Sequence, residues 1–187
     1  ARVDGKQGWL KSFQVAGREF LAGSLRPNFW RVPTDNDNGW KVPQKMGAWK
    51  DAAMKSRLQS LAVETNAGDR RLTARLQLTV SNSTAQVSYA LLTNGSLHVE
   101  MILEPGPNAP ELPRVGMQFA LPAEFDRVRW FGRGPQENYW DRKSGAAVGT
   151  YFSTVREWLT PYVRPQENAN RTDVRWTGYL RLNYLTP

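Results

Sequence analysis

Three segments of this sequence combine carboxylate, amide, arginine and aromatic side chains, and they lie at residues 27–37, 132–142 and 161–168. Such side chains can bind a sugar, because amides and carboxylates bond hydroxyl groups and aromatic faces stack on the C–H faces of pyranose rings. The same residue types also build turns, buried ion pairs and loop anchors in β proteins. Judged from the residues alone, this structural interpretation outweighs the sugar-binding one.

Two of the segments carry a glutamate among aromatic residues, and paired carboxylates are what a glycosidase uses for acid/base chemistry. These glutamates are Glu137 and Glu167, each followed by an asparagine and each near an arginine, Arg142 or Arg164. Carboxylates in such a setting form ion pairs or accept hydrogen bonds from the backbone. We therefore predict a structural role for both glutamates.

Other reactive groups are scarce. The chain has no cysteine and a single histidine, His98, which excludes disulfides, thiolate catalysis, Cys-ligated zinc and a two-histidine acid/base pair. His98 lies on the polar phase of its strand and is expected to face solvent. Asp35 and Asp37 resemble a metal-binding Asp-x-Asp pair, but turn stabilisation explains them better. We therefore expect no metal site and no cofactor in this chain.

The charge of +8 comes from 25 Lys plus Arg against 17 Asp plus Glu. These charges do not cluster, because the longest basic runs are Arg70-Arg71 and Arg142-Lys143. Nucleic acid is therefore not expected as a partner, and an interface with acidic neighbouring domains explains the charge more simply. No apolar run is long enough to span a bilayer, so no membrane contact is expected, and localisation is left open.

The elements that must position these segments are strands. Alternation of apolar and polar residues, the period of a half-buried strand, runs through residues 72–80, 87–91, 97–103 and 115–121. Asn94-Gly95 joins the second and third series and predicts a type I′ hairpin turn. A short strand begins at Val128 and Trp130 and is expected to be interrupted by Gly132 and Gly134.

Weaker patterns complete the prediction of an all-β fold with one short helix. A first hairpin turned at Gly17, a helix over residues 45–61, a proline-rich loop over residues 104–113 and a last strand over residues 177–185 are expected. In that last strand Leu180, Leu182 and Tyr184 should point inward. No internal repeat or linker divides residues 1–187, which we interpret as a single domain cut at or near its C-terminal edge.

The three segments resemble, in type, order and spacing, the signatures of the small-chain domain of bacterial β-galactosidases of glycoside hydrolase family two. Residues 29–37 fit a Phe/Leu-Trp-Arg-x-Pro-Thr-Asp-Asn-Asp pattern, and residues 132–142 fit Gly-x-Gly-Pro-x-Glu-Asn-Tyr-x-Asp-Arg. A third pattern fits Tyr162, Pro165, Glu167, Asn168, Asp173, Arg175 and Trp176. A chance match to all three in order is very improbable.

The resemblance implies an antiparallel β-supersandwich of the galactose-mutarotase-like type, truncated at the C-terminus, from a larger enzyme that hydrolyses terminal β-D-galactosides such as lactose. In this family a separate (β/α)-barrel carries the two catalytic glutamates and most ligands of any divalent metal. The resemblance therefore implies no catalytic residue here, and partners that are a β-galactoside or other sugar and the remaining domains of the enzyme. It also places a substrate-proximal loop at Gln136, Glu137, Asn138, Tyr139, Trp140, Asp141 and Arg142.

Three functions compete at this point: a non-catalytic assembly domain, an autonomous carbohydrate-binding module and an aldose epimerase. The single outward-facing histidine argues against the epimerase, which needs histidine acid/base chemistry. Trp30, Trp140 and Trp176 are the tryptophans expected to stack on sugar or to seal the interface with missing domains. The isolated chain is expected to lack hydrolytic activity.

Overall fold

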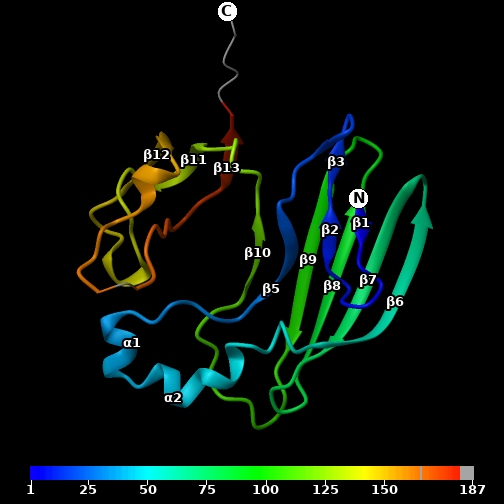
Figure 1. The fold of residues 1–187 in the computed structure, drawn as a ribbon, viewed down its shortest axis with the longest axis horizontal. Helices are drawn as coiled ribbons and strands as arrows, with labels where there is room; N and C mark the ends of the chain where they lie inside the picture. The colour runs from blue at the N-terminus through cyan, green and yellow to red at the C-terminus, as the bar shows by residue number, and fades with distance from the viewer. Residues whose placement is uncertain (165, 182–187) are drawn as a thin grey trace, which may run out of the picture. The chain divides into compact units, whose positions relative to one another are not determined.

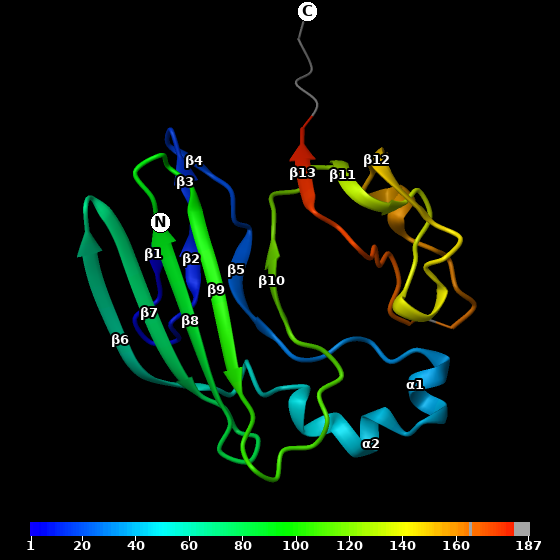
Figure 2. The ribbon, with the colours of Figure 1, turned by 180° about the vertical axis from the view of Figure 1, so that it is seen from behind.

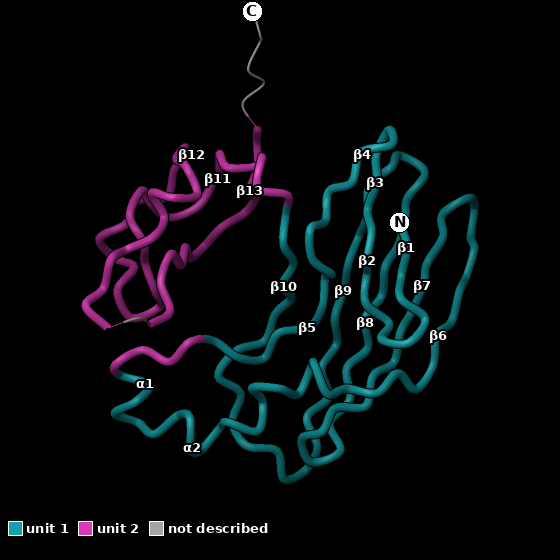
Figure 3. The backbone as a smooth tube through the Cα atoms, in the orientation of Figure 1, with its two compact units in different colours: residues 1–31, 36–121 teal, residues 32–35, 122–187 magenta. Residues whose placement is uncertain are grey.

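The computed structural model describes residues 1–164 and 166–181, and the chain divides into two compact units (Figure 3). Unit 1 comprises Ala1–Arg31 and Asn36–Leu121, and unit 2 comprises Val32–Asp35 and Pro122–Pro187. The structure consists mainly of antiparallel strands with few short helices, which confirms the predicted all-β class. The interpretation of residues 1–187 as one domain stays a prediction, and each unit is described by itself.

Unit 1 contains two four-stranded antiparallel sheets and a small two-stranded ribbon (Figures 1 and 2). The first sheet has the order β1-β2-β5-β10, with bounds Arg2–Val3, Leu10–Ser12, Gly23–Asn28 and Gly116–Ala120. The second sheet has the order β6-β7-β8-β9, with bounds Arg57–Asn66, Asp69–Gln77, Thr84–Leu91 and Leu97–Glu104. The ribbon pairs β3 (Gln14–Val15) with β4 (Arg18–Glu19) and confirms the hairpin at Gly17.

The core of unit 1 lies between these two sheets. The second sheet buries Leu76, Val87 and Tyr89 of the predicted alternation, and the inward residues of β9 are partly buried against them. The first sheet contributes Leu10 and Leu25 to the same cluster. Burying one such aliphatic side chain stabilises the fold by about 1.5–3 kcal/mol. The alternating strands predicted from residues 72–103 are therefore confirmed, and His98 is exposed as expected.

The turns differ from the prediction in type. The hairpin at Asn94-Gly95 exists, but only Gly95 has a positive φ, and its N–H donates to the Leu92 carbonyl at 2.9 Å. A type I′ turn needs positive φ at both central residues, so that prediction is wrong. Pairs of positive φ angles occur instead at Ala16-Gly17, between β3 and β4, and at Ala67-Gly68, between β6 and β7. In both hairpins the strand pairing on either side imposes a conformation that alanine disfavours.

The helix expected over residues 45–61 is also wrong. Only α2 (Val42–Met46) and the 3-10 helix η1 (Gly47–Trp49) form in this region, after a short α1 (Asp35–Gly39) that was not predicted. From Arg57 onward the chain is strand β6, which pairs with β7 along its whole length. The inter-strand hydrogen bonds and the packing of Leu58 on the core outweigh the local helical pattern.

Unit 2 contains a three-stranded antiparallel sheet with the order β12-β11-β13, where β11 is Arg127–Gly134, β12 is Ala147–Thr154 and β13 is Trp176–Leu180. Gly132 and Gly134 do not interrupt β11. They permit close packing, because a Cβ at Gly134 would lie 2.8 Å from the Tyr151 ring. Leu180, expected to point inward, is exposed, and Leu182 and Tyr184 lie outside the described residues.

Candidate functional site

A cleft of about 770 Å³ lies within unit 2. Its lining combines two carboxylates, two arginines, hydroxyl groups and aromatic rings. The lining residues are Trp130, Pro135, Gln136, Glu137, Arg142, Phe152, Ser153, Glu157, Trp158, Thr160, Tyr162 and Arg171. The cleft therefore offers both hydrogen-bond donors and acceptors beside apolar surfaces.

The predicted substrate-proximal loop contributes only part of this lining. Gln136, Glu137 and Arg142 line the cleft, whereas Asn138 is buried beneath it. The 3-10 helix η2 (Trp140–Arg142) ends the loop and turns the side chain of Arg142 back toward Glu137. The loop thus lines the cleft with some of its side chains and buries another, Asn138, in the interior of unit 2.

Glu137 is the best-connected carboxylate of the cleft. Its Oε1 accepts hydrogen bonds from the Arg142 guanidinium at 2.6 Å and from the Tyr162 hydroxyl, and its Oε2 accepts one from the Ala169 N–H at 2.8 Å. The side chain is only 7% exposed. The predicted structural ion pair of Glu137 with Arg142 is confirmed, and it joins the second and third sequence segments through Tyr162.

These contacts set the protonation of the group. Burial alone would raise the pKa of Glu137, but the hydrogen bonds from Tyr162, Arg142 and Ala169 together hold this pKa below its ordinary value. The bond to Glu137 and burial raise the pKa of the Tyr162 phenol. Glu137 is therefore an anion and Tyr162 a neutral donor near neutral pH.

Asn138 ties the loop to a second loop that follows in unit 2. Its Oδ1 accepts from the Thr172 N–H at 2.8 Å and from the Thr172 hydroxyl at 2.5 Å, while its N–H donates to the Asn170 carbonyl at 3.0 Å. Asn170 returns a side-chain bond to the Asn138 carbonyl at 2.8 Å. The two loops are consequently held by reciprocal polar contacts rather than by apolar packing.

Hydrogen bonds of Arg133 form a second polar connection between these loops. Arg133 donates to Asp173 at 2.6 Å and to the carbonyls of Lys143 and Ala146 at 3.1 and 2.7 Å. The hydrogen bond from Arg133, with the charge of Lys143 nearby, lowers the pKa of Asp173. The carboxylate and arginine residues of these motifs thus fix loops, as their turn-building interpretation predicts.

The sequence did not predict the part of the cleft lining that is formed by Trp130, Trp158 and Arg171. The Arg171 guanidinium lies 5.3 Å from the Trp130 ring and 4.7 Å from the Trp158 ring, and these two indoles pack edge to face. Burial lowers the pKa of Arg171, although the group stays cationic near neutral pH. No local pattern marks this stack, because its three members are far apart in the chain.

Glu157 is the second carboxylate of the cleft. It forms a reciprocal capping box with Thr154: the Thr154 N–H donates to Glu157 Oε2 at 2.7 Å, and the Glu157 N–H donates to Thr154 Oγ1 at 3.2 Å. These hydrogen bonds lower the pKa of Glu157. The Thr-x-x-Glu spacing at the 3-10 helix η3 (Arg156–Trp158) is a signal that could have found it.

The tryptophans singled out from the sequence fall into different environments. Trp140 is 80% exposed, and the Lys143 ammonium lies 3.7 Å from its ring. Trp176 is half-exposed on β13, and Trp30 is partly buried. Trp140 is therefore the one most open to a ligand.

The first segment contributes aromatic packing and an ion pair. Phe29 is buried against Trp49 with ring centroids 5.7 Å apart, and Arg31 pairs with Asp37 at 2.9 Å. Within residues 1–164 and 166–181 no group of three or more possible ligands could hold a metal ion. The pairing of Glu167 with Arg164 stays a prediction, and Pro165 of the third motif lies outside the described residues.

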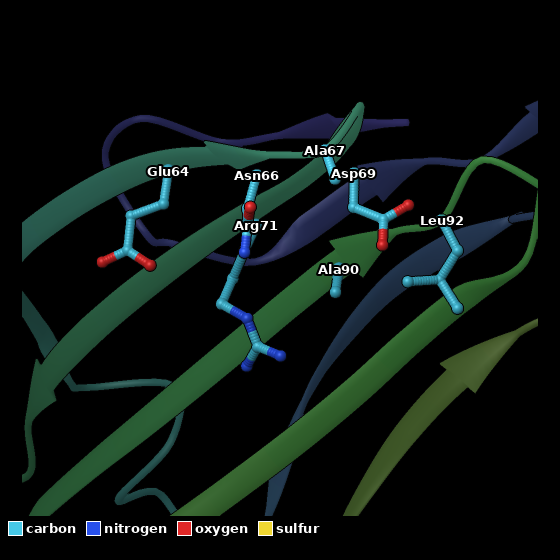
Figure 4. Close-up of a pocket in the computed structure, with 7 residues that line it drawn as sticks. All are labelled: Glu64, Asn66, Ala67, Asp69, Arg71, Ala90 and Leu92. Atoms are coloured by element: carbon cyan, nitrogen blue, oxygen red, sulfur yellow. The ribbon is translucent and has the colours of Figure 1, made fainter.

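A smaller pocket of about 250 Å³ lies at the β6–β7 hairpin of unit 1 (Figure 4). Its charged lining includes Glu64 and Arg71, which are cross-strand neighbours, and Asp69, which accepts the Thr93 N–H at 2.8 Å. These contacts belong to the hairpin, and none of the three sequence segments reaches the pocket.

In the described part of the chain no helix is long and apolar enough to cross a bilayer.

Comparisons with known proteins agree with the motifs. A family model described as beta galactosidase small chain matches residues 1–182. A beta-galactosidase of Priestia megaterium is 40% identical over 176 residues, which cover 94% of this chain. Beta-galactosidases of Halalkalibacterium halodurans and Vibrio cholerae are 34% and 37% identical over 94% and 90% of this chain. The chain spans only 17–18% of the length of these relatives.

Proposed function

Because the chain belongs to the beta-galactosidase small-chain family, we propose that it is a non-catalytic part of an enzyme that hydrolyses terminal β-D-galactosides. In this proposal the rest of the enzyme supplies the catalytic carboxylates and the ligands of any divalent metal. The present chain completes the surroundings of the substrate and the assembly of the domains.

The proposed non-catalytic role rests on the protonation state of the two glutamates that line the cleft. A glycosidase needs one carboxylic acid with a raised pKa to protonate the leaving group and a second carboxylate as nucleophile or base. Here the pKa values of Glu137 and Glu157 are both lowered, and each group accepts a backbone N–H, Glu137 from Ala169 and Glu157 from Thr154. Two structural anions cannot supply the acid of this reaction.

The loop from Gln136 to Arg142 is proposed to border the path of the substrate. Its polar residues line the cleft together with exposed Phe152, and Trp140 of the same loop is 80% exposed with the Lys143 ammonium beside its ring. This combination suits hydroxyl groups and the apolar faces of a pyranose. The loop would then shape access to the sugar without taking part in bond cleavage.

A chimaera tests the proposal. The matching segment of the Priestia megaterium beta-galactosidase is replaced by these 187 residues, and hydrolysis of a chromogenic β-galactoside is measured. We expect turnover by the chimaera and none by the relative lacking the segment. The 187-residue chain alone should be inactive, and turnover by that purified chain would refute a non-catalytic role.

The exposed Trp140 favours one second candidate, an autonomous carbohydrate-binding module. Titration of the chain with galactose and lactose, followed by heteronuclear NMR, separates the two functions. Saturable binding that Trp140→Ala abolishes would favour the module. Absence of binding, with an active chimaera, would favour the assembly domain.

A further inference from the structure

The sheet of unit 2 has two faces of different character, and the strand register defines which residues lie on each. One face points Val128 and Trp130 inward, and both are buried. The other face, here called the aromatic–arginine face, carries Arg129, Phe131, Val148, Phe152, Trp176 and Leu180.

Four of the five apolar residues of the aromatic–arginine face are exposed, and Phe131 is partly buried. Phe152 is 62% exposed and Trp176 is 45% exposed, and Val148 and Leu180 are similarly accessible. An antiparallel sheet with one face exposed to solvent normally carries polar residues on that face. Large exposed apolar patches on soluble proteins mark interaction sites.

The outer face of the β6–β9 sheet provides an internal reference. There Thr73 bonds Ser88 across the strands, and Arg75 lies 3.6 Å from Glu104. That face is mostly polar, with Ile102 as its one large exposed apolar residue on β9, and its charges of opposite sign face one another, as expected of a solvated surface. The aromatic–arginine face therefore differs from a solvated face of the same molecule.

The charge of the aromatic–arginine face is positive. β11, β12 and β13 contain no aspartate or glutamate, and Arg129 lies on this face. Arg127 and Arg133, on the same side of β11, are paired with Asp126 and Asp173 of the adjoining loops. The Arg129 guanidinium lies 5.8 Å from the Trp176 ring, and Arg175 lies 5.6 Å from the Phe131 ring. A second copy of this chain, also at +8, would meet the face with like charge.

We infer that the aromatic–arginine face docks onto an apolar surface with an acidic rim, belonging to the part of the beta-galactosidase outside these 187 residues. This inference rests on the proposed function and names the surface through which it acts. More than four-fifths of each relative's polypeptide lies outside the matched segment, so the required partner is present in such an enzyme. Aromatic and arginine anchors with complementary charge are typical of protein interfaces.

Association in trans tests the inference. The chain is mixed with the Priestia megaterium beta-galactosidase that lacks its matching segment, and the Kd is measured by analytical ultracentrifugation. The test variant is Arg129→Glu with Trp176→Ser. The matched control is Arg75→Glu with Val63→Ser, which changes an exposed arginine and an exposed aliphatic residue of the other sheet. Circular dichroism checks folding, and Arg129→Glu with Leu180→Ser replaces the test variant if it unfolds.

We expect the test variant to weaken association by about tenfold or more and the control to change it by less than about twofold. Equal weakening by both variants, no association of the wild-type chain, or self-association of the chain through this face would each overturn the inference. Turnover of the mixture is recorded separately. Tight association without turnover would refute the proposed function while leaving the docking surface intact.

Discussion

The β6–β9 sheet of unit 1 and the β11–β13 sheet of unit 2 are both antiparallel, yet different interactions hold their surroundings in place. The first sheet packs an alternating row of aliphatic residues into an apolar core and leaves a polar outer face. In unit 2 the loops beside the sheet are held by side-chain hydrogen bonds of Asn138, Glu137 and Arg133. Apolar burial tolerates small geometric changes, whereas such a polar network depends on each partner being present.

The largest expected effect lies in the apolar core of unit 1. Leu76 is fully buried, so Leu76→Ala should lower the free energy of unfolding by about 3 kcal/mol through lost burial and a residual cavity. Urea denaturation followed by circular dichroism measures it. Leu61→Ala, on the exposed part of β6, is the control and should cost less than about 1 kcal/mol. Similar losses for both would show that the core is not the main source of stability in unit 1.

A smaller effect is expected at the loop tie of unit 2. Asn138→Ala would leave the partly buried N–H and hydroxyl of Thr172 without their acceptor, which costs about 2 kcal/mol. Hydrogen exchange should show the loss in residues 133–142 and 169–175 and not in β6–β9. Asn94→Ala removes only an exposed turn bond to Ser96 and is the control. Uniform loss of protection in both units would contradict a tie confined to unit 2.

The smallest effect should be pH-dependent. The pKa of Glu137 is lowered in the folded protein, so its stabilising contribution is present above its ordinary pKa of 4.5 and is lost as pH falls through the lower folded value. Glu137→Gln should therefore cost less than about 1 kcal/mol at pH 7, because Arg142 is half-exposed.

The pH profile of that variant distinguishes a charge effect from a packing effect. Between pH 6 and the acid transition, the stability difference between wild type and Glu137→Gln should shrink, as measured by urea denaturation at each pH. Glu64→Gln, on exposed β6, is the control. A difference that stays constant down to the acid transition would show that Glu137 acts through packing alone.

Local sequence patterns determined much about this protein. The alternation over residues 72–103 specifies strands and their buried faces, because a period of two places every second side chain on the same side. The three motifs indicated the family, and the arginine beside Glu137 indicated its ion pair. The absence of cysteine and the single histidine excluded whole classes of chemistry.

Only the tertiary structure decided where the chain departs from local preference. Arg57 to Leu61 fitted a helical stripe but form a strand, because β7 offers them inter-strand hydrogen bonds. Paired positive φ angles occur at Ala16-Gly17 and Ala67-Gly68 rather than at Asn94-Gly95, since strand pairing sets the φ angles there. Trp130, Trp158 and Arg171 meet in one cleft wall although nothing in their spacing predicts it. Such contacts join residues distant in sequence, so they depend on how the strands and loops pack and not on any local pattern.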